Sequence, residues 1–163
     1  MPLKYKFALF FILFSCLSCF VFAQNNDVET LINYANTFLG TPYKAGGTTR
    51  KGMDCSGFLF TTVQDSLHIK FPRTASDMFN KCARIKEGPV MRGDLVFFYT
   101  AGKKISHVGI YLGDGNFIHS ASDGPKKGVI ISNLSESYWS RTYGGAGRFL
   151  EHSDVEFELN GAF

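Results

Sequence analysis

The sequence predicts an α+β domain in which helices come first along the chain and an antiparallel sheet follows. Three observations support this. Apolar residues fall at helical spacing between residues 28 and 67, short strand-like apolar runs follow after Gly88, and two of these runs flank a tight-turn sequence. Helices and strands that occupy separate parts of a chain are typical of the α+β class.

Residues 1–23 have the pattern of a secretory signal peptide. Lys4 and Lys6 come first, residues 7–22 carry no charge, and Val21 and Ala23 are small residues at the two positions that a signal peptidase reads before the predicted cleavage after Ala23. A retained membrane anchor would need about 20 apolar residues, and lipidation of Cys19 or Cys16 is a second alternative. We therefore expect an exported protein with one domain over residues 24–163, either free or lipid-anchored.

The charge of the exported chain is close to neutral. The full sequence has 17 basic and 14 acidic residues, and the signal removes two of the basic ones and none of the acidic ones. A chain with this balance is not an electrostatically driven nucleic-acid binder. Cys55 and Cys82 remain after export, and a disulfide between them is the simple alternative to the role considered for Cys55 below.

The helical part is expected to contain three helices. The first covers residues 28–39, with Asp27 as its cap and Gly40 at its end. Residues 41–54 are rich in turn formers and cannot continue a helix. The second helix covers residues 55–67, and a short third helix covers 74–83 after a break at Pro72. The apolar positions of the first helix are Val28, Leu31, Ile32, Ala35, Phe38 and Leu39, and the inner face of the second is Phe58, Leu59, Thr62 and Val63.

The sheet part is expected to contain five strands, at residues 95–99, 107–112, 117–119, 129–131 and 147–150. The sequence Gly113-Asp114-Gly115-Asn116 predicts a tight hairpin between the second and third of them. Tyr138 and Trp139 are expected in a short helix or turn.

Cys55 is a candidate nucleophile because Asp54-Cys55-Ser56-Gly57 lies where a glycine-rich loop meets a predicted helix start. The positive end of a helix dipole lowers the pKa of a thiol and favours the thiolate. Unpaired N–H groups at a helix start could also bind an oxyanion. The structural alternative is that Cys55 is a small buried helix residue.

Two histidines on the predicted hairpin could complete this site. His107 and His119 are not directly opposite in a regular register, but a slanted pair or a bulge would bring them together. His107 would then be the base and His119 the group that orients it. Backbone-bonded histidines at strand ends are the alternative. Zinc binding by Cys55, His107 and His119, with Asp54, is disfavoured because the chain has no close ligand pair, and His68 and His152 are expected at the surface.

Seven segments of the chain together resemble one known family. They are Thr41-Pro42-Tyr43 with Gly46-Gly47, Asp54-Cys55-Ser56-Gly57, Pro72-Arg73-Thr74, residues 93–98 (GDLVFF), residues 106–113 (SHVGIYLG), residues 117–121 (FIHSA) and Gly145-Ala146-Gly147-Arg148. In this order, over residues 40–148, they resemble the NlpC-type cell-wall peptidases, which are papain-like cysteine hydrolases.

The resemblance implies a papain-like NlpC-type fold with Cys55 as nucleophile, His107 as general base and His119 as third catalytic residue. It implies that Tyr43 lines the site and assists the oxyanion, and that Asp54 and Ser56 help to bind the substrate. Relatives of this kind hydrolyse peptidoglycan stem peptides after D-glutamate through a thioester and need no cofactor. An amidase or acyltransferase on the same scaffold, or a non-catalytic wall-binding protein, remains an alternative.

Overall fold

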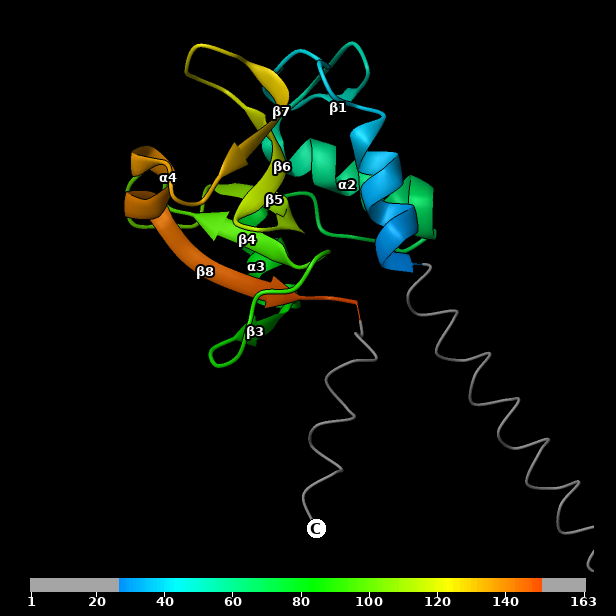
Figure 1. Cartoon of the computed structure of the whole chain (residues 1–163). Helices are drawn as coiled ribbons and strands as arrows, with labels where there is room; N and C mark the ends of the chain where they lie inside the picture. Colours follow the sequence, from blue (N-terminus) through cyan, green and yellow to red (C-terminus); the bar gives the residue numbers. More distant parts are fainter. Residues whose placement is uncertain (1–26, 151–163) are drawn as a thin grey trace, which may run out of the picture.

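The structure is a computed structural model that describes residues 27–150 and has helices packed on an antiparallel sheet (Figure 1). Its elements in chain order are a helix over 27–36, β1 Thr48–Thr49, β2 Gly52–Met53, α2 Cys55–Leu67, α3 Ala75–Lys81, β3 Ala83–Ile85, β4 Leu95–Phe98, β5 His107–Gly113, β6 Asn116–Ala121, β7 Gly128–Asn133, α4 Ser137–Thr142 and β8 Tyr143–Arg148. The main sheet has the order β3-β8-β4-β5-β6-β7, and β1 pairs with β2. All pairings in the main sheet are antiparallel, so the α+β prediction is confirmed.

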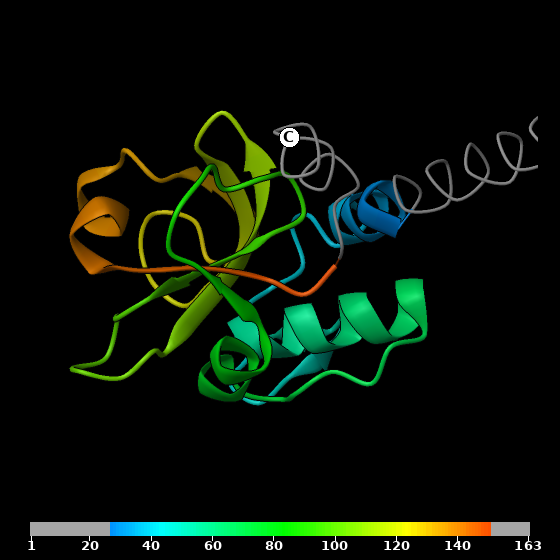
Figure 2. The ribbon, with the colours of Figure 1, turned by 90° about the horizontal axis from the view of Figure 1, so that it is seen from below.

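The sheet is covered on both faces. The helix over 27–36, α2 and α3 lie on one side, and α4 lies on the other (Figure 2). A core on the α2 side joins Phe58 and Leu59 to Phe97 and Ile110 of the sheet. A smaller core on the α4 side contains Val96, Phe98, Phe117, Trp139 and Ala146.

The first helix ends earlier than predicted, and Asp27, expected as its cap, already lies within it. It ends at residue 36, and residues 37–40 form a turn in which Thr37 and Phe38 donate hydrogen bonds to carbonyls three residues back. This tighter winding buries Phe38 but leaves Leu39 47% exposed, so Leu39 does not share the buried position of the other apolar residues predicted at helical spacing. Gly40, with φ +82°, then donates to the Val129 carbonyl and fixes the chain to β7.

α2 has the predicted bounds and the predicted buried face. Phe58, Leu59, Thr62 and Val63 are all fully buried. Asp54 caps the start of the helix, and His68, in the left-handed conformation with φ +57°, ends it. Because His68 is also exposed, its predicted surface position is confirmed.

The other elements follow the predictions with shifted ends. α3 is shorter than predicted because Thr74 is its N-cap and Ala83 already begins β3. α4 forms around Trp139. The last strand, β8, runs from Tyr143 to Arg148 instead of over 147–150. β1, β2 and β3 were not predicted, since each has only two or three residues and no apolar alternation.

A buried ion pair joins two neighbouring strands of the sheet. The Asp94 carboxylate, just before β4, is fully buried and accepts two hydrogen bonds of 2.8 Å from Arg148 at the end of β8. Asp94 also accepts a bond from the backbone N–H of Met91 at 2.6 Å. The carboxylate is thereby paired on both oxygens.

Several sequence predictions concern residues outside the described range. The signal peptide over 1–23, with Cys16 and Cys19, and His152 all lie there. Within 27–150 no helix combines the length and the apolar character that crossing a membrane requires.

Candidate active site

Cys55 is the first residue of α2, and a folded-back loop holds the preceding Asp54 in place. Asp54 Oδ1 accepts from the N–H of Gly57 at 2.6 Å, as an N-cap does, and Oδ2 accepts from the N–H of Gly46 at 2.8 Å. A side chain on Gly57 would collide with the carbonyl of Gly47. The glycines of these two motifs therefore allow the loop to pack directly on the helix start.

Arg73, which sequence reasoning gave no role, pairs with Asp54 beside the cysteine. Its two terminal nitrogens donate to the two carboxylate oxygens at 3.0 and 2.9 Å, and one of them also donates to Ser56 Oγ at 2.9 Å. Burial alone would raise the Asp54 pKa, but the bonds from Arg73 and Gly57 lower it below its usual value. Asp54 and Ser56, expected as substrate-binding residues, thus bind each other and Arg73 in this structure.

The Cys55 thiol is buried against the start of β5. It donates to the carbonyl of Ser106 at 3.7 Å, directly before His107, and no hydrogen bond in the described part of the chain joins it to the His107 ring. Burial raises the thiol pKa to about 11, and the Asp54 charge adds to this, although backbone N–H groups, including that of Val108, act in the opposite direction. The backbone N–H groups at the helix start act in the expected direction, but desolvation outweighs them, so the thiol pKa is raised and not lowered. Cys55 and Cys82 are both free.

His107 and His119 are in direct contact, as the hairpin prediction required. His107 Nε2 lies 2.9 Å from His119 Nδ1, and the two side chains are 5% and 0% exposed. Burial lowers the His107 pKa to about 4, and burial together with the neighbouring His107 lowers the His119 pKa further. Both imidazoles are therefore neutral at neutral pH.

This contact depends on a bulge in the β5–β6 hairpin. Tyr111 faces Phe117, whereas Gly113 faces Asn116, so Leu112 is one extra residue in β5. The turn itself is two residues long. Asp114 and Gly115 both have positive φ, of 52° and 78°, as the predicted tight turn requires.

The bulge determines the face on which His119 lies. In the register beyond the bulge, His119 is placed opposite Gly109, two residues from His107 and on the same face of the sheet. A side chain on Gly109 would collide with Phe117 and lie only 3.1 Å from the Cβ of His119. If the same residues paired regularly from the two-residue turn, with no bulge, His119 would face Ile110 and point to the opposite side.

Among the residues that contact the histidine pair, sequence reasoning missed Ser132 and Trp139. Ser132 Oγ on β7 lies 3.1 Å from His119 Nε2. The Trp139 ring stacks on His107 with centroids 5.1 Å apart and meets the edge of His119 at 4.7 Å. Nothing local marks either residue in the sequence, since the contacts depend on how β7 and α4 pack on the hairpin.

Tyr43 lies on the loop before β1, where its backbone bridges to Met53. Burial raises the pKa of its phenol, and the charges of Cys55 and Asp54 raise it further. The hydroxyl therefore lies within electrostatic range of the thiol, as its expected place in the site requires.

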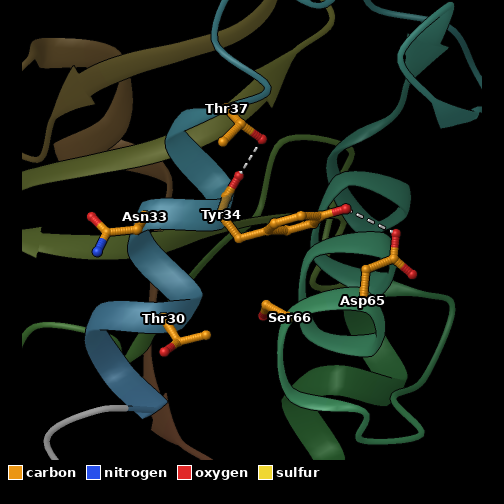
Figure 3. Close-up of a pocket in the computed structure, with 6 residues that line it drawn as sticks. All are labelled: Thr30, Asn33, Tyr34, Thr37, Asp65 and Ser66. Carbon is orange, nitrogen blue, oxygen red and sulfur yellow. Dashed lines mark hydrogen bonds between the residues drawn. The ribbon is translucent and has the colours of Figure 1, made fainter.

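A hollow of about 520 Å³ between the first helix and α2 is separate from these residues (Figure 3). It is lined by Thr30, Asn33, Tyr34, Thr37, Asp65 and Ser66, and the Tyr34 hydroxyl donates to Asp65 across it at 3.2 Å. Asp65 is ten residues after Cys55 in the same helix, which is about 15 Å along its axis. Among residues 27–150 no group of three or more His, Cys, Asp or Glu could hold a metal ion.

A thiol at a helix start, beside a histidine pair on two neighbouring strands, is typical of the class of cysteine hydrolase sites. Residues 40–148 match the NlpC/P60 family. The chain is 40% identical over 122 residues to the probable endopeptidase NlpC homolog of Haemophilus influenzae, covering 75% of this chain and 63% of that protein. It is 37% identical over 132 residues to the murein DD-endopeptidase MepS/murein LD-carboxypeptidase of Escherichia coli, covering 80% and 68%.

Solved structures agree with this match. The crystal structure of an NlpC/P60 family protein from Bacillus cereus superimposes with a TM-score of 0.69 at 34% identity, covering 76% of this chain and 40% of that one. The chain belongs to the NlpC/P60 family, and the resemblance stated from its motifs is confirmed. It spans less than two thirds of the length of the Haemophilus relative.

Proposed function

We propose that the protein is an exported cysteine endopeptidase that hydrolyses amide bonds in peptidoglycan stem peptides. The observation that carries this proposal is the buried contact between His107 on β5 and His119 on β6, next to Ser106, whose carbonyl accepts from the Cys55 thiol. The names of the relatives support the substrate class, since they include murein endopeptidases. The apolar segment over 1–23 and the extracytoplasmic position of peptidoglycan support export.

The proposed reaction begins from a neutral thiol and a neutral imidazole. His107 Nε2 is occupied by His119, so Nδ1 is the nitrogen left to take the Cys55 proton as the sulfur attacks the amide carbonyl. The backbone N–H groups of Cys55 and Ser56, which contact the sulfur, and the Tyr43 hydroxyl would stabilise the oxyanion. The imidazolium then protonates the leaving amine, and water hydrolyses the thioester with His107 as base.

Two bonds are candidates for cleavage. The resemblance implies a cut after D-glutamate, which is a D,L bond, and this is our first proposal. The second is a D,D bond, because two of the relatives, at 42% and 37% identity, are named murein DD-endopeptidases. A D,L cut shortens individual stems, whereas a D,D cut separates cross-linked stems.

Mass spectrometry of peptidoglycan digested with residues 24–163 tests the proposal. We expect new stem-peptide fragments from the wild type and none from Cys55→Ala, because that variant lacks the nucleophile. Cys82→Ala is the matched control: it removes the other buried thiol and should retain activity. Cleavage between sugar and peptide would indicate an amidase. Transfer of the acyl group to an added amine would indicate a transferase. Binding to peptidoglycan without any products would indicate a wall-binding protein.

A further inference from the structure

Three polar side chains form a continuous buried series across β5, β6 and β7. His107 Nε2 meets His119 Nδ1 at 2.9 Å, and His119 Nε2 meets Ser132 Oγ at 3.1 Å. The three residues are 5%, 0% and 9% exposed. Water therefore has little access to replace any of these contacts.

The register of the strands explains why Ser132 occupies this place. Ser132 faces Phe117, and His119 faces Ile130, so Ser132 and His119 are diagonal neighbours on one face of the sheet. His119 and His107 are diagonal neighbours in the same way across the preceding hairpin. Each step of the series, from β5 to β6 and from β6 to β7, therefore joins two diagonal neighbours on the same face of the sheet.

In the tautomer that the proposed reaction needs, each ring depends on its neighbour in the series for a hydrogen-bond acceptor. Burial keeps both imidazoles neutral, so each ring carries one N–H and one lone pair. If His107 is to accept a proton at Nδ1, its own proton must be on Nε2, where it is donated to His119 Nδ1. The His119 proton is then on Nε2 and needs an acceptor, and the atom at that position is the Ser132 oxygen.

The opposite arrangement would disable the base. If His119 carried its proton on Nδ1, it would donate to His107 Nε2 and place the His107 proton on Nδ1. That nitrogen would then have no lone pair for the thiol. The Ser132 hydroxyl can accept from a protonated Nε2 or donate to an unprotonated one, so it permits both arrangements. Without that hydroxyl, the first arrangement would leave the Nε2 proton buried with no acceptor, which is costly.

We propose that Ser132 is a positioning residue that holds the His119 ring and supplies the acceptor for its Nε2 proton, and that it thereby supports the tautomer in which His107 can act as base. This inference rests on the proposed function for its consequence, because the tautomer matters only if His107 acts as base. It assigns β7, the edge strand of the sheet, a part in the site.

The test uses the nearly isosteric pair Ser132→Thr and Ser132→Val, since only the first retains a hydroxyl. We expect Ser132→Val to lower kcat on the stem peptide by about ten- to a hundredfold with KM little changed, as for other residues that hold a catalytic histidine in its active tautomer. Ser132→Thr, which retains the hydroxyl, should keep most of the wild-type kcat. Ser132→Ala, which adds no bulk, should resemble Val, and urea unfolding would establish that each variant is folded.

Imidazole ¹⁵N chemical shifts give a second readout that does not depend on hydrolysis. In the wild type we expect a protonated Nε2 and an unprotonated Nδ1 on both His107 and His119, and in Ser132→Val a shift toward protonated Nδ1. The inference would be overturned if the wild type and Ser132→Val had equal kcat, or if the imidazole nitrogen shifts were unchanged in Ser132→Val. A wild type with the expected shifts but no peptide cleavage would instead contradict the proposed function.

Discussion

Thr62 is the clearest unfavourable contact at the scale of single residues. Its side chain is fully buried in α2, and its hydroxyl has no hydrogen-bond partner. A buried hydroxyl without a partner has lost its hydration and gained nothing in return. Thr62 is one of the residues predicted for the inner face of α2. The spacing of a buried helix face can therefore include a polar residue.

We predict that Thr62→Val raises the free energy of unfolding by about 1 kcal/mol, because Val has nearly the same shape and no hydroxyl to desolvate. Chemical denaturation measures this change. Thr61→Val is the matched control, since Thr61 donates to the Thr48 carbonyl at 2.9 Å. That substitution should lower stability, and a stability gain in both variants would contradict our explanation.

The pKa of Cys55 also belongs to this scale. Sequence position placed the thiol at a helix start, and the structure confirms that position. The direction of the pKa shift is nevertheless upward, because burial and the Asp54 carboxylate outweigh the backbone N–H groups. Burial depends on what packs over a residue, which a local motif does not reveal.

At the scale of elements, the ion pair between Asp94 and Arg148 joins β4 to β8. The side chain of Asp94 is 0% exposed and that of Arg148 is 20% exposed. Removing one partner leaves an uncompensated charge in the interior. The pair is thus more important to stability than an exposed pair of the same length.

We predict that Arg148→Met lowers the free energy of unfolding by about 3–5 kcal/mol. Urea titration measures the loss. Glu29→Gln breaks the exposed pair between Glu29 and Arg92, whose side chains are 50% and 45% exposed, and should cost less than about 1 kcal/mol. Similar losses in the two variants would show that burial does not set the strength of these pairs.

Elements with local signals were predicted, and elements that depend on pairing were not. The cap at Asp54 and the apolar spacing gave α2 its correct bounds, and the glycine-rich turn gave the β5–β6 hairpin. β3 has three residues and forms only by pairing with β8, which itself contains three glycines among six residues. The role proposed for Ser132 likewise required the β6–β7 register.

At the scale of the whole molecule, the candidate site lies where the two cores meet. Cys55 belongs to the core on the α2 side, whereas His107 and His119 pack against Trp139 on the α4 side. The motifs predicted which residues take part, but the arrangement needs both faces of the sheet to be covered. The site therefore forms only in the fully folded chain.

The buried histidines predict acid sensitivity of the whole fold. Their pKa values are lowered in the folded state, so between pH 6.5 and about 4 the unfolded chain binds more protons, and stability falls as the pH falls. Between pH 7 and 5 we expect a loss that reaches about 1.4 kcal/mol per pH unit for each histidine. Urea unfolding followed by Trp139 fluorescence measures it.

His119→Asn should reduce this pH dependence, because one of the two buried histidines is gone. His68→Asn is the control: His68 is exposed, and Asn tolerates its left-handed conformation. Its pH dependence should match the wild type. An equal reduction in both variants would show that the acid sensitivity does not come from the buried pair.

The register around Leu112 determines where this hairpin can change in length. Surface turns normally tolerate insertions and deletions, and Asp114 at this turn is exposed. Here deletion of Leu112 would leave Tyr111 opposite Phe117 and Gly109 opposite His119, so the two histidines would still share one face of the sheet. Deletion of Ile118 with the bulge retained would instead place His119 opposite Ile110, whose side chain lies in the core on the α2 side. The hairpin can therefore lose one residue at the bulge, whereas the loss of one residue between Phe117 and His119 would separate the two histidines.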